Sequence, residues 1–312
     1  MAPNNPQLHH VVVFNNKGFR NPATYATYLN RFRDRPIYPS LSIQSSTFNK
    51  YDMDLPFLIR NLGWESMFEH QRFSHCPEAV RLFYVNIKRG RGVEPSLFTT
   101  KVFNHEITIT PALLASFLSL PHSGHQTGFN GEFEDLGFDY HMALNVFTRD
   151  TGRHYPNMLS AGRLPNDLKV FHFFITRCFL PRDLSSVEFL HPSDLWIISN
   201  AKAGKRISYA SLVFAHMLCF GDGSYNGKLP FGPIITRLLH RLGIDLRDKV
   251  TVCDVLDDIC PNHILNHLDM DVGRRKPVAG SGGRRGPFYV KPLHAGQCLG
   301  RCGSSGSGEG NQ

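Results

Sequence analysis

The sequence predicts a mainly α protein: a globular body of several helices, one small β-hairpin and a disordered C-terminal tail. Apolar residues make up 41% of the 312 residues and aromatic residues 12%, which is enough to build a core. In most of the chain they recur at three- and four-residue spacing, the period of an amphipathic helix. From Gly273 onward the composition changes to Gly, Ser, Arg and Pro, which cannot bury enough apolar surface to fold.

We expect three parts along the chain. Residues 1–20 form a loose N-terminal segment, 21–272 a mainly helical domain, and 273–312 a disordered basic tail. The body has no internal repeat and no linker rich enough in Pro, Gly or Ser to divide it. The Gly- and His-containing loop at 123–137 is the best candidate for a boundary inside the body.

Caps and apolar spacing place the elements of the first half. Asn21 and Thr110 each precede a proline, the pattern of an N-cap followed by proline at the first helical position. Trp64 is expected to pack as a bridge between two helices. Thr and β-branched residues after Gly92 favour strands. We predict helices at about 22–33, 52–63, 77–88 and 112–120, and a β-hairpin at 97–109 turning around Asn104 and His105.

The second half is more strongly helical. The segment from Leu168 to Leu180 is apolar nearly all round, which predicts a buried central helix, and Pro181 ends it. His172 in that segment is expected to be a core histidine satisfied by a hydrogen bond. Ser193 and Asp194 are expected to cap the next helix. We predict helices at 168–180, 193–203, 208–220 and 234–242, the last one followed by Gly243 as a C-cap.

The formal charge of +8 is concentrated in the tail. The tail carries seven basic residues against Glu309 alone, whereas residues 1–272 sum to only +2. A short basic arm can bind phosphates through counterion release, and a near-neutral body gives no general reason to expect such a surface. We therefore predict nucleic-acid contact in the tail, at Arg274, Arg275, Lys276, Arg284, Arg285, Lys291 and Arg301.

A second basic group lies near the N-terminus. Because Asp34 sits among these residues, a solvated face is the first interpretation and nucleic-acid contact the alternative. The group consists of Lys17, Arg20, Arg31, Arg33 and Arg35.

The segment from Gly221 to Lys228 resembles a phosphate-binding loop only in part. Gly221 is one residue too far from Gly227, and Leu229 stands where that loop needs a magnesium-binding hydroxyl. A helix rather than a strand is expected before it. We interpret the segment as a turn between helices.

Three groups of metal-binding residue types have simpler interpretations, so we predict no metal site and no cofactor. Cys253, Cys260, His263 and His267 could form a zinc set only if Pro261 folds their helix back, and otherwise fill an apolar stripe. His294, Cys298 and Cys302 lack the order of a zinc knuckle. The acidic group of Glu132, Glu134, Asp135 and Asp139 could hold magnesium for a nuclease, but acidic loops are usually solvated.

The sequence also predicts the class of protein and its compartment. Seven scattered cysteines, an odd number, are typical of a reducing compartment. The first residues lack the pattern of a signal peptide, and no apolar run is long enough to span a bilayer. The motifs of nucleophile elbows, zinc proteases and dinucleotide sites are missing from the sequence. We expect an intracellular protein, nuclear or cytoplasmic, that is not an enzyme and has no membrane or small-molecule partner.

One resemblance to a known family is carried by several segments taken in order. The segments are Val80–Ile87, Lys101–Pro111, Leu118–Pro121, Leu164–Pro165, Leu180–Arg182, Ile207–Ala210 and Leu229–Thr236, with Trp64 ahead of the first. They resemble the plant transposon protein domain, a family associated with plant retrotransposons, and the resemblance covers roughly residues 61–247. Helical proteins of Athila-type retrotransposons are a second resemblance. The resemblance implies an origin in transposable elements; the family has no established activity or catalytic residues to transfer.

Together these observations predict a non-catalytic interaction module of transposable-element origin that self-associates and contacts nucleic acid through its tail. The alternative is a metal-dependent nucleic-acid-processing enzyme derived from a transposase. A third interpretation is a relic without selected function.

Overall fold

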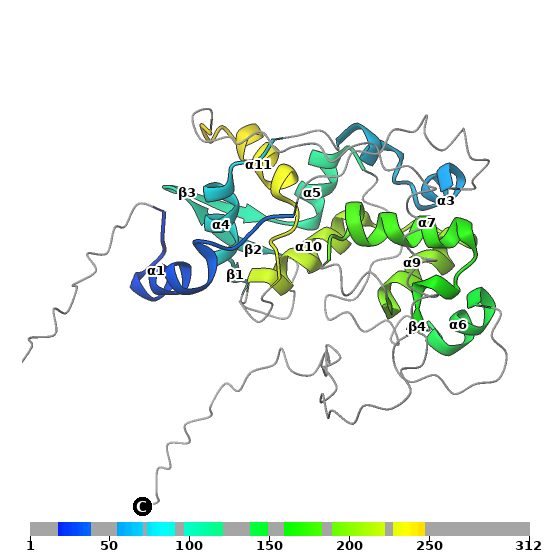
Figure 1. Cartoon of the computed structure of the whole chain (residues 1–312). Helices are drawn as coiled ribbons and strands as arrows, with labels where there is room; N and C mark the ends of the chain where they lie inside the picture. The colour runs from blue at the N-terminus through cyan, green and yellow to red at the C-terminus, as the bar shows by residue number, and fades with distance from the viewer. Residues whose placement is uncertain are drawn as a thin grey trace, which may run out of the picture.

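The computed structural model describes most of the body and confirms a mainly α fold (Figure 1). Helices predominate from α1 to α11, with three short strands between α4 and α5 and two more, β4 and β5, on either side of α7. The tail at 273–312, the Cys and His group at 253–267 and the loop at 123–137 lie outside the described residues. Those residues are 18–38, 55–70, 74–90, 97–120, 138–148, 159–182, 189–221 and 227–246.

The first predicted helix is present in two parts. Helix α1 (Pro22–Thr27) begins where the Asn21 side chain accepts a hydrogen bond from the backbone N–H of Thr24, as the sequence predicted. The π-helical turn η1 (Tyr28–Phe32) continues it and buries Phe32.

Helix α3 (Leu55–Leu62) and helix α4 (Pro77–Val85) each bury an apolar face, as their spacing predicted. The predicted end of α4 at residue 88 is wrong. Lys88 and Arg89 instead form strand β1 (Lys88–Arg89), which pairs antiparallel with the hairpin. Between the helices, η2 (Glu65–His70) is a 3-10 helix.

The hairpin consists of β2 (Phe98–Val102) and β3 (His105–Ile109), in the sheet order β1-β2-β3. Its turn lies one residue earlier than predicted, because Phe103 adopts φ +52° and Val102 pairs with His105. Helix α5 (Pro111–Leu118) follows, with the Thr110 hydroxyl accepting from the backbone N–H of Leu113.

In the second half the helices match the prediction, with three differences. Helix α6 and the β4–β5 pair had not been predicted. The N-cap of α9 is His191, not Ser193 or Asp194, because Pro192 already occupies the first helical position. These elements are α6 (Tyr140–Thr148), β4 (Leu159–Ser160), η4 (Ala161–Arg163), α7 (Asn166–Phe174), η5 (Ile175–Phe179), β5 (Phe189–Leu190), α9 (Pro192–Lys202), α10 (Tyr209–Gly221) and α11 (Gly232–Arg241).

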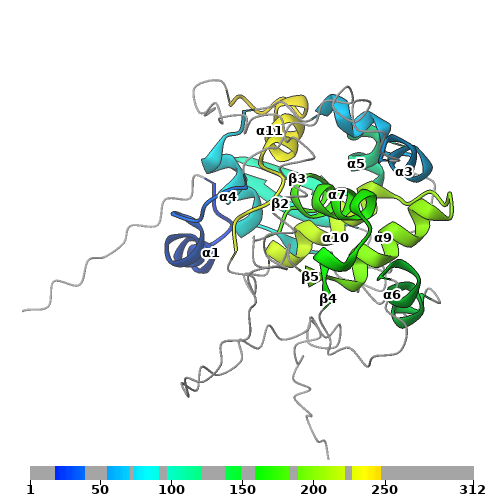
Figure 2. The same ribbon diagram turned by 45° about the vertical axis from the view of Figure 1, so that its right-hand side comes forward.

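Helix α10 lies between two groups of elements. Figures 1 and 2 show α1, α4 and the sheet on one side of it, and α3, α9 and α6 on the other. The buried apolar residues form one core cluster that runs from Phe19 to Leu246. Trp64 is 1% exposed, which agrees with the predicted packing role. Its indole N–H donates to the carbonyl of Ile207 at 3.0 Å, so this hydrogen bond joins the end of α3 to the segment before α10 and does not join α3 to α4.

One buried amide ties the N-terminal segment to α4 and the sheet. The Asn86 side chain is 1% exposed and donates to the carbonyls of Gly18 (2.7 Å), Leu82 (3.0 Å) and Lys101 (2.7 Å). Its own oxygen accepts from the backbone N–H of Arg20 at 3.2 Å. Loss of this amide would remove its hydrogen bonds to Gly18, Lys101 and Arg20, whereas the carbonyl of Leu82 would keep the backbone N–H of Asn86.

We therefore predict that Asn86→Ala lowers the free energy of unfolding by about 3 kcal/mol in denaturant titration. Asn145→Ala is the matched control, because Asn145 is exposed on α6 and alanine favours a helix; it should change stability by less than about 0.5 kcal/mol. Equal effects of the two substitutions would contradict the role of the buried amide.

Candidate functional site: a buried aspartate cluster

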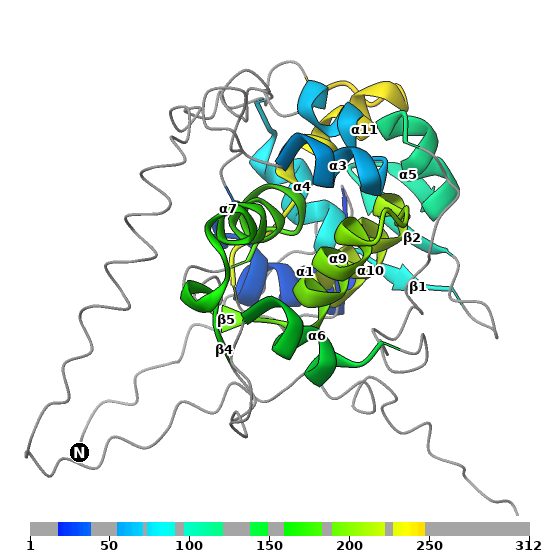
Figure 3. The ribbon, with the colours of Figure 1, turned by 90° about the vertical axis from the view of Figure 1, so that its right-hand side faces the viewer.

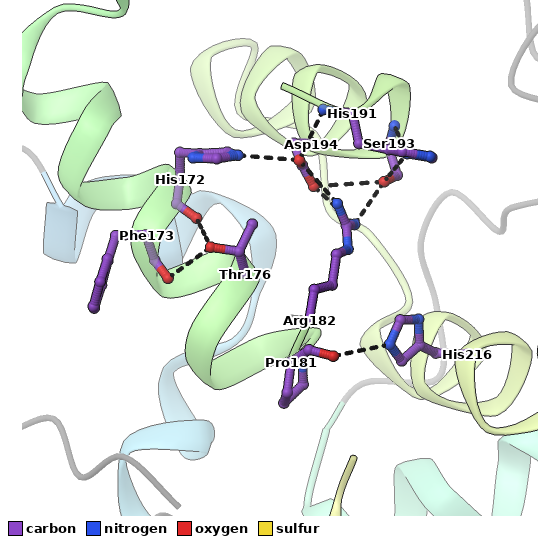
Figure 4. Close-up of polar contacts among 9 residues, drawn as sticks. All are labelled: His172, Phe173, Thr176, Pro181, Arg182, His191, Ser193, Asp194 and His216. Carbon is purple, nitrogen blue, oxygen red and sulfur yellow. Dashed lines mark hydrogen bonds and ion pairs between the residues drawn. The ribbon is translucent and has the colours of Figure 1, made fainter. Parts of the chain in front are cut away.

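The described residues bring one group of titratable side chains together inside the fold, around Asp194 (Figure 4). Asp194 lies in the first turn of α9 with a side chain that is 0% exposed. Its carboxylate accepts a hydrogen bond from the backbone N–H of His191 at 3.1 Å. This closes a capping box at the N-terminus of α9, where the helix dipole favours a negative charge.

Two cationic or polar side chains complete the cluster. Arg182 donates from Nη1 to Oδ2 of Asp194 at 3.0 Å and from Nη2 to Oδ1 at 2.9 Å, a two-point ion pair. The Nη2 atom also donates to the Ser193 hydroxyl at 2.8 Å. His172 contributes its Nε2, 3.1 Å from Oδ2, so the expected hydrogen bond of this core histidine is confirmed. We call Asp194, Arg182, His172, His191 and Ser193 the Asp194 cluster.

The end of the central helix explains why Arg182 reaches Asp194. Helix α7 widens into the π-helical turn η5, in which the Thr176 hydroxyl donates to the carbonyl of His172 at 3.0 Å. Pro181 then stops the helix, and the backbone N–H of Arg182 donates to the carbonyl of Thr176 at 3.0 Å. This turn directs the guanidinium toward the N-terminus of α9.

The electrostatics of Asp194 follow from its partners. Burial by itself raises the pKa of a carboxyl group, but Arg182 and His172 outweigh it and hold the pKa of Asp194 well below its usual range. The carboxylate is therefore charged in the folded protein. Because it accepts from His172, the Nε2 of that ring carries a proton, while its buried Nδ1 has no hydrogen-bond partner among the described residues.

The cluster contains serine, histidine and aspartate, but their contacts are not those of a catalytic triad. The Ser193 oxygen accepts from Arg182, and it lies 2.9 Å from Nδ1 of the His191 ring. Asp194 contacts the ring of His172 and only the backbone of His191. A triad needs the carboxylate to orient the histidine that activates the nucleophile. The contacts of Asp194 instead join the end of α7 and the segment after η5 to the start of α9.

His216 extends this junction from α7 and α9 to a third helix, α10. Its Nε2 lies 3.3 Å from the carbonyl of Pro181, and its ring contacts those of Phe220 and Phe231. Burial and the nearby charge of Arg182 lower the pKa of His216 to about 3. The neutral ring therefore donates to Pro181, and three helices meet at this point.

The N-terminal basic group does not form a shared surface. Arg35 is 7% exposed, donates to the carbonyl of Gly227 at 2.6 Å and lies over the ring of Phe32. Arg20 pairs with Glu106, and Arg33 pairs with Asp34. Arg31 and Arg33 are exposed, and Lys17 lies outside the described residues.

The other predicted site residues are mostly outside the described part of the chain. This holds for the seven basic residues of the tail and for both Cys and His groups. Asp139 alone of the acidic group is described, and its carboxylate caps α6 by accepting from the backbone N–H of Met142 at 2.9 Å. Within the described ranges no three His, Cys, Asp or Glu residues are placed to hold a metal ion, and Cys76, Cys178 and Cys219 form no disulfide there.

Fold and site together define a mainly helical domain whose main buried polar cluster joins its own elements. The chain belongs to a known family: residues 60–245 match the model described as "Putative plant retrotransposon-related domain", which makes it a transposable-element-derived protein. Neither the curated proteins nor the solved structures include a match to it. No helix in the described ranges has the length and apolar character that crossing a bilayer requires.

The role of the Asp194 cluster leads to a stability prediction. Asp194→Asn should cost about 3–5 kcal/mol of unfolding free energy, because it leaves Arg182 as a charge with no counterion at that place. Asp167→Asn is the control, since its pair with Lys202 is partly exposed and should contribute under about 1 kcal/mol. Chemical unfolding measures the free energy of unfolding of both variants. If Asp194→Asn lowers this free energy no more than Asp167→Asn does, the structural role of the Asp194 cluster is contradicted.

The lowered pKa of His216 leads to a pH prediction. Since the fold favours the neutral ring, proton uptake favours the unfolded chain, whose histidine has a pKa of about 6.5. This contribution to stability is present above pH 6.5 and is lost as the pH falls from about 6.5 toward 3, at about 1 kcal/mol per pH unit.

His216→Gln keeps an N–H donor for Pro181 and should lack this contribution. The difference in unfolding free energy between the unaltered protein and the His216→Gln variant, measured from pH 7 to 4, should therefore shrink as the pH falls. A constant difference would show that His216 takes up its proton equally in both states.

Proposed function

We propose that this transposable-element-derived protein is a non-catalytic interaction module that associates with nucleic acid through its basic tail. The observation that carries the proposal is the distribution of charge. Residues 273–312 hold seven basic side chains against one acidic side chain. Such a segment attracts phosphates without sequence preference, because binding releases condensed counterions.

The non-catalytic part of the proposal is supported by the Asp194 cluster. Catalytic groups must face a substrate, whereas the charged groups of the Asp194 cluster face one another. Asp194 and His172 are both 0% exposed, and Arg182 is 12% exposed. The competing assignment, a metal-dependent nucleic-acid enzyme, relied on acidic residues around 132–139, of which Asp139 caps a helix.

The tail proposal is tested by replacing all seven basic residues of 273–312 with Gln in the full chain. The unaltered protein should bind RNA or DNA with an affinity that falls steeply with salt, and the tail variant should bind much more weakly and lose most of that salt dependence. Fluorescence anisotropy at 50–300 mM salt measures both.

The control variant replaces seven Ser and Gly residues of the same segment with Gln. It changes the composition of the tail and leaves the charge of the tail intact. Unchanged binding after removal of the tail charges would exclude the tail as the binding segment. Cleavage of the oligonucleotide in Mg²⁺ or Mn²⁺ would instead favour the enzyme assignment.

A further inference from the structure

We propose that the exposed face of α3 and the turn after α9 form a second, rigid binding surface for single-stranded nucleic acid, made of Phe57, Arg60, Lys205 and Arg206. We call these four residues the α3–α9 surface. The proposal adds a site on the folded body to the one proposed in the tail.

The described part of the body is more basic than the body as a whole. The described residues carry 19 Lys and Arg side chains against 9 Asp and Glu side chains. The near-neutral sum of residues 1–272 therefore averages over segments of different charge. Most acidic side chains of the body belong to the segments outside the described ranges.

Many of these basic side chains are already used within the fold. Arg182 pairs with Asp194, Arg20 with Glu106, and Arg35 is buried. The exposed side chains of Arg60, Lys205 and Arg206 differ, because none of the three has an ion pair or hydrogen bond with a described residue.

Contacts made by adjacent residues hold the backbone around Arg60 close to the backbone around Lys205 and Arg206. The Asn61 side chain, next to Arg60, donates to the carbonyl of Ala201 at 2.7 Å. The backbone N–H of Ile207, next to Arg206, lies 3.4 Å from the carbonyl of Leu62, and the indole of Trp64 donates to Ile207. Figure 3 shows α3 and α9 side by side on this face of the molecule.

The turn that carries Lys205 and Arg206 has a fixed shape. Gly204 has φ +68°, a conformation that ends α9, and the backbone N–H of Lys205 donates to the carbonyl of Asn200 at 2.9 Å. The basic side chains therefore project from a well-defined backbone, which lowers the entropy lost on binding.

An exposed aromatic ring lies on the same face of α3. Phe57 is 56% exposed although it is a large apolar residue, and it stands three residues before Arg60, so both project to one side of the helix. Aromatic rings beside cationic side chains are the elements that bind single strands, since bases stack on the ring while phosphates contact the charges. In a duplex the bases are already stacked and cannot use the ring.

A simpler interpretation is that the basic residues only complement the negative ends of two helix dipoles. That effect is worth a few tenths of a kcal/mol per residue and falls off within the last turn. It accounts neither for the exposure of Phe57 nor for basic residues beyond Gly204. Among the side chains that the structure describes, the neighbouring acidic residues are Asp167, which pairs with Lys202, and the exposed Glu65.

The test uses the full chain and anisotropy titrations with a 20-nucleotide single strand and a duplex of equal length. The surface variant combines Arg60→Gln, Lys205→Gln and Arg206→Gln. The matched control combines Lys88→Gln, Lys228→Gln and Arg241→Gln, which removes the same charge from exposed positions that are far apart in the sequence. Both are made with the native tail and with the charge-neutral tail, and thermal unfolding confirms that each protein folds.

The surface variant should weaken single-strand binding at least tenfold and reduce the slope of log K against log salt by about 2, in both tail backgrounds. The scattered control should change affinity by less than threefold. Phe57→Ala should weaken single-strand binding about tenfold and leave duplex binding unchanged.

Equal effects of the surface variant and the scattered control would overturn the proposal, because only net charge would then matter. Equal loss of single-strand and duplex binding in Phe57→Ala would overturn the assignment to single strands. The tail proposal is judged separately by the difference between the two tail backgrounds, so each proposal can fail without the other.

Discussion

The structure depends on one buried charge. A carboxylate that is 0% exposed is tolerated only where enough donors replace the water it has lost. Asp194 finds them in the backbone of His191, in Arg182 and in His172, which come from the start of α9, the segment after η5 and the last turn of α7. The relative positions of α7 and α9 therefore follow from the need to satisfy this one group.

The same constraint limits what the cluster can do. Each donor that Asp194 requires is unavailable to a ligand, and burial together with the nearby charge of Arg182 favours the neutral form of His216. The charges of the Asp194 cluster thus act on the orientation of helices. In both proposals, nucleic-acid binding is assigned to side chains that the core does not need.

The sequence predicted best the elements that are specified locally. Asn21 and Thr110 cap the helices that they were expected to cap, because an N-cap depends on residues within one turn. Strand β1 was missed because only pairing with Phe98 and Thr99 makes Lys88 and Arg89 extended. The Asp194 cluster was missed for the same reason, since its partners are separated by up to 22 residues and meet only once the helices cross.

The charge of the body shows where reasoning from composition fails. A sum over residues 1–272 weights every side chain equally, whereas a ligand meets only the charges that remain exposed and unpaired. In the proposals made above, the tail supplies attraction that needs no fixed geometry, and the α3–α9 surface supplies a few contacts held in place by backbone hydrogen bonds. Because both belong to one chain, occupation of either raises the effective concentration of the strand at the other, so a small rigid surface gains affinity that its own contacts do not provide.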